Sequence, residues 1–347
     1  MLLNIQMLRA LAALAVVLYH LGPHYRDAGG AFDALIRVSE WGFFGVDVFF
    51  VISGFVISLT VFPRERNLAG AATFLRHRLA RIFLGYWPFA LLALYVLPLH
   101  SAANLAQVST FHSLTLTSAD MALLALPVAW SLAYELYFYG LFGLLYGCSN
   151  TAIRRVLLVI FIVLLGRVLW LQVDPGSKLY FWVSAYLLEF LYGVLIYLYQ
   201  GLVCKRRLIP ASVVLIIAGL MLGAGNQLEH DARVLYFGIS AAAIVTLALQ
   251  LETNDLFKAP GWLVTLGDSS YALYLSHLFV ITAFYQWGWR DDLAAQSPWL
   301  AELGFLALLV YIVFLAHFWY RRVERPRYLK AIGRRPPASS ATSPAGE

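Results

Sequence analysis

The stretch LLNIQMLRALAALAVVLYHLG, residues 2–22, decides the class of this protein. It is almost entirely apolar, and about 20 such residues are what an α-helix needs to cross the hydrocarbon core of a bilayer. Arg9 and His20 interrupt it. They lie eleven residues apart, and at about 100° per residue this spacing returns to one helix face, about 16 Å further along the axis. The sequence therefore predicts a membrane helix with one polar face.

The composition extends this interpretation to the whole chain. Of 347 residues, 61% are hydrophobic and 13% are charged, whereas soluble domains carry about 45–50% apolar and about 25% charged residues. We therefore expect one membrane domain over residues 1–330. Residues 331–347, which are small, polar and Pro-containing, are expected to form a disordered cytoplasmic tail.

Ten stretches of about 20 mostly apolar residues follow one another, so we expect an all-α, polytopic fold. The expected spans cover residues 2–22, 41–62, 80–99, 126–147, 153–172, 180–200, 208–225, 232–251, 262–285 and 298–320. The first is expected to be a retained helix rather than a signal peptide, because no basic stretch precedes it and Arg9 lies in its body.

The basic residues set the expected orientation. With the N-terminus in the cytoplasm, 18 of the 25 Lys and Arg residues fall in cytoplasmic segments, 5 fall in external segments, and Arg9 and Arg167 lie within spans. This asymmetry follows the positive-inside rule and places both termini in the cytoplasm. The net charge of +6 is thus explained without nucleic acid, which we do not expect as a partner. Cys148 and Cys204 fall at helix ends on the cytoplasmic side, where neither a disulfide nor a cysteine-based metal site is expected.

Asp47 lies near the external end of the second span, within WGFFGVDVFFVISGF. A carboxylate at that depth is most simply kept by pairing with His20, which would orient the imidazole and raise its basicity. A helix cap or a water-facing position is the alternative for Asp47. Further along, Ser53, Gly54 and Ser58 form a small, polar strip that permits close helix packing.

Three arginines occupy the stretch FLRHRLARIFLGYW that follows. Arg78 and Arg81 share a helix face, whereas Arg76 points elsewhere. These arginines are either ordinary cytoplasmic charge or a clamp for a phosphate-bearing ligand, since guanidinium groups match phosphate geometry.

Other ionisable groups lie inside the expected spans, where a charge costs about 2.5–3.5 kcal/mol. Glu135 in AWSLAYELYFYG is a candidate site residue, with a structural ion pair as the alternative. Arg167 and Glu189 are not otherwise explained, and the simple option is that they pair with each other. In SSYALYLSH, the remaining site candidates form a stripe that is either aromatic packing or part of the site: Tyr271, Tyr274 and His277.

Taken in order, these pieces resemble the family-3 membrane acyltransferases. The matching elements are Arg9 and His20 in the first span, VDVFFVISGF, the R-x-R of Arg76 and Arg78 with Arg81 beyond, WSLAYE, SYALYLSH and a closing ERP. The resemblance covers about residues 5–328. It implies ten membrane helices in a bacterial inner membrane, and transfer of an acyl group, usually acetyl, from cytoplasmic acyl-CoA to a hydroxyl of a glycan or lipid-linked glycan.

The resemblance also implies residue roles. It makes His20 the catalytic histidine, and Arg9 with the R-x-R pair donor-binding or structural residues. Physical reasoning agrees, because His20 oriented by Asp47 is suited to act as general base, with Glu135 as a further catalytic candidate. A transient acyl-histidine stays open. Neither a metal nor a permanently bound cofactor is expected. The alternative function is a proton-coupled transporter of small anions that uses Arg9, Asp47, Glu135 and His277.

Overall fold

The computed structural model describes residues 2–25, 33–63, 67–171, 173–174, 177–224, 230–286 and 298–333. Within these ranges the regular secondary structure is helical and no strand occurs, which confirms the all-α prediction. Most of the tail expected to be disordered, from residue 334 onward, lies outside the described residues.

Eleven longer helices lie within the described ranges. They are α1 (Leu3–Leu21), α3 (Phe44–Val61), α4 (Leu68–Tyr95), α7 (Trp130–Leu145), α8 (Asn150–Trp170), α10 (Tyr186–Leu198), α12 (Ile209–Gly223), α14 (Ile239–Thr253), α15 (Gly261–Asp268), α16 (Ser270–Gln286) and α18 (Pro298–Trp319). The short α-helices are α2 (Asp33–Ser39), α5 (Ala102–Leu105), α6 (Thr110–Thr115), α9 (Lys178–Trp182), α11 (Gln200–Val203), α13 (His230–Arg233) and α19 (Arg325–Ala331). Two π-helical turns, η5 (Val234–Gly238) and η6 (Tyr320–Glu324), continue α13 and α18.

Seven helical stretches within the described residues are long and apolar enough to cross a membrane. Each of the ten expected spans contains a helix, but the spans expected at 80–99, 153–172 and 262–285 are not among the seven. The physical reasons differ. Helix α4 carries basic residues in its first half, α8 holds three arginines in 21 residues, and α16 is a separate helix of 17 residues after α15. The polytopic class is thus confirmed, while the number ten and the sides of the termini stay predictions.

Helix α3 is the central element, because it packs closely against both α1 and α10. Glycines permit this approach: a Cβ added at Gly45 would lie 2.3 Å from the carbonyl oxygen of Ala12, and one added at Gly54 would lie 1.9 Å from that of Phe190. The small strip expected at Ser53, Gly54 and Ser58 therefore does serve close packing.

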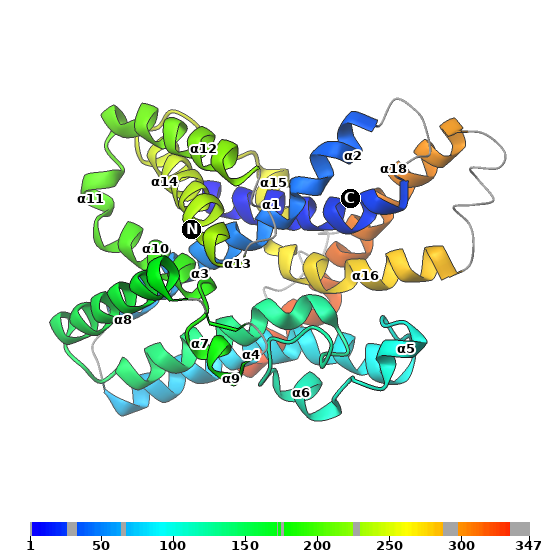
Figure 1. Ribbon diagram of the computed structural model, residues 1–347, viewed down its shortest axis with the longest axis horizontal. Coiled ribbons are helices and arrows are strands. Elements are labelled where there is room, and N and C mark those ends of the chain that lie inside the picture. The colour runs from blue at the N-terminus through cyan, green and yellow to red at the C-terminus, as the bar shows by residue number, and fades with distance from the viewer. Residues whose placement is uncertain are drawn as a thin grey trace, which may run out of the picture.

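Figure 1 shows how the remaining helices surround this centre. Helices α8, α10, α12 and α14 lie on one side of α1 and α3, and α16 and α18 lie on the other, with α4 and α7 along a third edge. Helix α1 contacts α3, α14, α15 and α16. The first and ninth expected spans are thus neighbours in space, and this brings their histidines together.

Candidate active site

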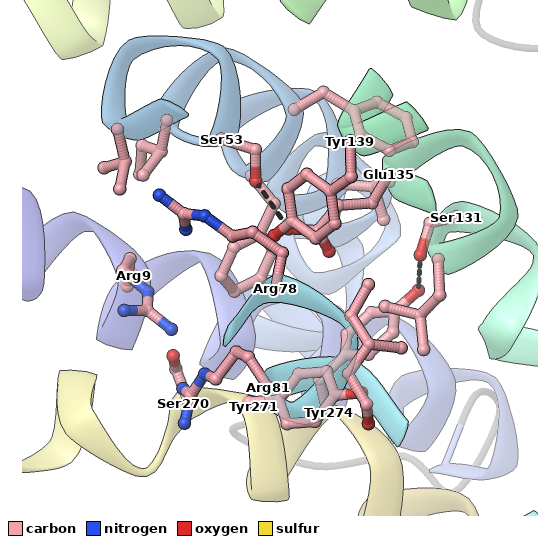
Figure 2. Close-up of a pocket in the computed structure, with 17 residues that line it drawn as sticks. Arg9, Ser53, Arg78, Arg81, Ser131, Glu135, Tyr139, Ser270, Tyr271 and Tyr274 are labelled. Carbon is pink, nitrogen blue, oxygen red and sulfur yellow. Dashed lines mark hydrogen bonds between the residues drawn. The ribbon is translucent and has the colours of Figure 1, made fainter. Parts of the chain in front are cut away.

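Seven of the side chains predicted as site residues converge on an inner cavity between α1, α3, α4, α7 and α16 (Figure 2): Arg9, Ser53, Arg78, Arg81, Glu135, Tyr271 and Tyr274. Its polar lining consists of Arg9, Ser53, Arg78, Arg81, Ser131, Glu135, Tyr139, Ser270, Tyr271 and Tyr274. The cavity encloses about 880 Å³ of empty space, its mouth included. Small-molecule sites combine apolar walls with a few polar groups, and the cavity has this character.

Arg78 and Arg81 enter this cavity from the same face of α4, as their spacing predicts. Arg78 donates to the Thr60 hydroxyl at 2.7 Å, and its guanidinium lies over the ring of Tyr139, 5.5 Å from the centroid. Arg81 forms an ion pair with Glu324 at 2.7 Å. Aromatic contacts thus accompany both guanidinium groups, and Arg78 takes part in none of the ion pairs among the described residues.

Arg76 stands apart from these two arginines. Its side chain is exposed, and within the described residues it lines neither the inner cavity nor the vestibule defined below. On an α-helix, a residue two positions from Arg78 points about 200° away. The structure therefore places only one member of the R-x-R pair in the site.

Glu135 faces the inner cavity from α7. It accepts a hydrogen bond from the Ser53 hydroxyl at 3.2 Å and another from the Tyr139 hydroxyl (Figure 2). The alternative for Glu135 was a structural ion pair. Glu135 takes part in none of the ion pairs among the described residues. Glu135 is thus a hydrogen-bonded carboxylate opposite Arg9 and Arg78.

A second cavity, called the vestibule here, adjoins the inner one. It shares Arg9, Arg78 and Arg81 with the inner cavity, and it is completed by Gln6, Thr60, Phe74, His77, Asp268, Tyr320, Arg325, Tyr328, Leu329 and Ile332. Four arginines and a histidine line it against a single aspartate, so the vestibule is strongly electropositive. The three shared arginines form the boundary between the two cavities.

Sequence reasoning missed the part of the vestibule that comes from the C-terminal end. Arg325 and Tyr328 reach it because η6 and α19 fold back onto α4, where Glu324 is buried and pairs with Arg81. Within the basic stretch YRRVERPRY, residues 320–328, the closing ERP supports the family resemblance, but from the sequence these residues had no expected role in the site. A lone Glu within that basic stretch was the available signal, because a buried carboxylate needs a cationic partner.

His20 and His277 form a pair beyond the inner cavity. Their ring nitrogens, Nδ1 of His20 and Nε2 of His277, lie 3.3 Å apart, and the ring centroids are separated by 5.0 Å. His277 is fully buried, whereas His20 is half-buried. Tyr274 connects the pair with the cavity, since it lines the cavity and its ring lies 6.1 Å from that of His277.

The predicted pairing of Asp47 with His20 is wrong. Asp47 is fully buried and receives two hydrogen bonds from the guanidinium of Arg233, one from Nε at 3.1 Å and one from Nη2. Glu189 lies beside this pair. Asp47 projects from the face of α3 that packs on α10 and η5, whereas His20 belongs to the contact of α1 with α16. The burial also rules out the alternative of a water-facing position.

The suggested pairing of Arg167 with Glu189 is also wrong. Arg167 forms an ion pair with Asp231 and stacks on Tyr180, while Glu189 belongs to the group of Asp47 and Arg233. Asp47, Glu189 and Asp231 line neither the inner cavity nor the vestibule. These charged side chains therefore belong to the contacts among α3, α8, α10 and α13 rather than to the two cavities.

Comparison with known proteins gives this geometry a context. The chain is 29% identical to the exopolysaccharide production protein ExoZ of Rhizobium meliloti over 86% of this chain and 93% of that protein. It is 27% identical to the acyltransferase MdmB of Streptomyces mycarofaciens, covering 97% of this chain and 94% of the relative. The O-acetyltransferase OatA of Staphylococcus aureus is 24% identical over 92% of this chain and 56% of its own length.

No solved structure matches the chain significantly. Residues 2–318 match the acyltransferase domain family. That match includes Arg9, His20, Arg78, Glu135 and His277, and it ends just before the π-helical turn η6. The chain belongs to this family of membrane acyltransferases.

Proposed function

We propose that this protein transfers an acyl group, in the simplest case acetyl, from cytoplasmic acyl-CoA to a hydroxyl of a surface or periplasmic glycan. The observation that carries the proposal is the spatial order of three sites along α1. An electropositive vestibule leads through three arginines into a polar inner cavity, and a histidine pair lies beyond it. Relatives named for exopolysaccharide production and O-acetyl transfer support a glycan hydroxyl as acceptor.

The vestibule suits the phosphate-bearing part of the donor. Guanidinium groups bind phosphate through paired, charge-assisted hydrogen bonds. Arg78 and Arg325 lie in the vestibule without a carboxylate partner among the ion pairs of the described residues, so they have donors to offer. Its placement at the cytoplasmic end of α1 follows from the proposed orientation.

The inner cavity suits the acyl-bearing arm. Val46, Phe49 and Leu132 give it apolar walls, and the hydroxyls of Ser53 and Tyr271 supply hydrogen-bonding groups. From Arg9 to His20 the helix rises about 16 Å at 1.5 Å per residue. The arm of the donor would cover this distance and bring the thioester toward the histidines.

In the proposed reaction His20 acts as general base. Its imidazole takes the proton of the acceptor hydroxyl while the hydroxyl oxygen attacks the thioester carbonyl carbon. The carbon–sulfur bond breaks, the thiolate of CoA leaves and recovers the proton, and the acyl group remains as an ester on the glycan. Positioned general bases contribute about 10²–10⁴-fold to such reactions.

A transporter is less well supported. That alternative needs Arg9, Asp47, Glu135 and His277 along one path, but Asp47 is fully buried in its ion pair with Arg233 on another face of α3. Label from acyl-CoA appearing on the glycan supports transfer, whereas uptake of an anion into vesicles without consumption of acyl-CoA supports transport.

The test of His20 uses purified protein in membrane vesicles, with radiolabelled acetyl-CoA and isolated surface glycan. His20→Ala is expected to lower the transfer rate by at least about 100-fold, while CoA binding and thermal unfolding stay unchanged. His112→Ala on α6, outside both cavities, is the matched control and keeps its activity. Full activity of His20→Ala would overturn the proposed role.

A further inference from the structure

His277 is fully buried in the middle of α16, and both nitrogens of its ring lie near polar atoms. Its Nδ1 lies 3.2 Å from the carbonyl oxygen of Leu273, and its Nε2 faces Nδ1 of His20 at 3.3 Å. Nδ1 of His20 also lies 2.9 Å from the carbonyl oxygen of Val16. Both rings are thus anchored to their own helices and to each other.

These contacts fix which nitrogens carry protons. A backbone carbonyl only accepts hydrogen bonds, so Nδ1 of each ring must carry the proton that the carbonyl receives. In neutral imidazole the other nitrogen is then a bare acceptor. Nε2 of His277 therefore presents a lone pair to the Nδ1–H of His20, which is shared between Val16 and His277. Any other neutral arrangement would set a lone pair of at least one Nδ1 against a carbonyl oxygen.

We propose that His277 is a positioning residue for the transfer reaction: by accepting from Nδ1–H of His20, it holds that ring in the tautomer whose Nε2 is free to take the acceptor's proton. The inference rests on the proposed function of His20. His277 thereby takes the orienting role that the sequence suggested for Asp47. A neutral imidazole can accept this hydrogen bond in a buried position, whereas a buried carboxylate would need a cation beside it.

The hydrogen bond gains strength when His20 becomes charged. Once Nε2 has taken a proton, the ring is an imidazolium, and its Nδ1–H becomes a charge-assisted donor, about twice as strong as a neutral one. His277 therefore stabilises the charged intermediate more than the resting site. Such an interaction raises kcat and leaves donor binding unchanged.

The experiment compares His277→Gln with His277→Leu. The amide oxygen of glutamine can occupy the place of Nε2 and accept the same hydrogen bond, whereas leucine fills space without an acceptor. We expect His277→Leu to lower kcat by about 10–100-fold with an unchanged KM for acetyl-CoA, and His277→Gln to recover most of that loss. Ser276→Ala, at the neighbouring buried position, is the control and keeps its kcat.

A double variant separates positioning from folding. If His277 acts through His20, then His277→Leu costs no further activity in a His20→Ala background, because coupled residues are not additive. Equal losses for His277→Gln and His277→Leu, or additive losses in the double variant, would overturn the inference. Full activity of His20→Ala would instead refute the proposed role of His20 on which the inference rests, so the two failures are distinguishable.

Discussion

Two groups of charged side chains among the described residues use the same residue types in opposite proportions. Around the vestibule, Arg9, Arg78 and Arg81 border open space, and Glu324 pairs with only one of them. In the group of Asp47, Arg233 and Glu189, Asp47 forms the ion pair with the arginine, Glu189 lies beside that pair, and both acidic side chains are fully buried. The first group has arginines in excess at a cavity, whereas in the second the arginine is paired within the protein.

The difference separates binding from packing. An arginine that lacks a carboxylate partner and faces a cavity is ready to receive an anion from outside. A carboxylate buried against a guanidinium joins helices, since removing one partner leaves the other charged and desolvated. Substitutions in the two groups should accordingly change different measured quantities.

The largest expected effect is on stability, in the second group. Arg233→Leu leaves Asp47 without its cation, and breaking a buried pair costs about 3–5 kcal/mol. We expect this loss of unfolding free energy in detergent-solubilised protein, measured by chemical denaturation. The double variant Asp47→Leu/Arg233→Leu should recover most of it and retain acyl transfer. Wild-type stability of Arg233→Leu, or an inactive but stable double variant, would contradict a structural role.

An intermediate effect is expected at the vestibule. Arg78→Ala removes a guanidinium held over Tyr139 and bonded to Thr60, and hydrogen bonds to charged groups contribute about 1.5–3 kcal/mol each. CoA affinity, measured by isothermal titration calorimetry, should fall by about 10–100-fold while the denaturation midpoint changes little. An unchanged affinity, or a loss of stability of the size expected for Arg233→Leu, would remove the distinction between the groups.

The smallest effect is expected at Arg76, which is exposed and outside both cavities. Exposed ion pairs contribute about 0.2–1 kcal/mol, so Arg76→Ala should weaken CoA binding by less than about fivefold in the same titration. A loss as large as that of Arg78→Ala would mean that the donor also contacts the outer face of α4.

Local patterns along the sequence predicted the features that a single helix determines, namely its position in the chain and the face on which each side chain lies. Apolar runs located the helices, and helical phase placed Arg78 and Arg81 on a common face with Arg76 elsewhere. Charge patterns also led to Arg9 and Glu135 as site candidates, and both line the inner cavity. None of these features requires knowledge of a neighbouring helix.

Partners across helices were not predictable in this way. Asp47 meets Arg233 at a separation of 186 residues, and His20 meets His277 at 257. Depth in the membrane made Asp47 a reasonable partner for His20, but the rotation of α3 about its axis decides which helix a side chain faces. That rotation is set by the close glycine contacts with α1 and α10, which only the packed structure contains.

The three arginines shared by the vestibule and the inner cavity also bear on which ions are kept out of the protein. Fixed positive charge in a narrow passage repels protons and metal cations, as it does in water channels. If the donor enters from one side of an energised membrane and the acceptor from the other, as proposed above, the protein must not short-circuit the proton gradient. Arg9, Arg78 and Arg81 lie at the boundary of the two cavities, so under that proposal the groups that attract the donor would also act as an electrostatic seal.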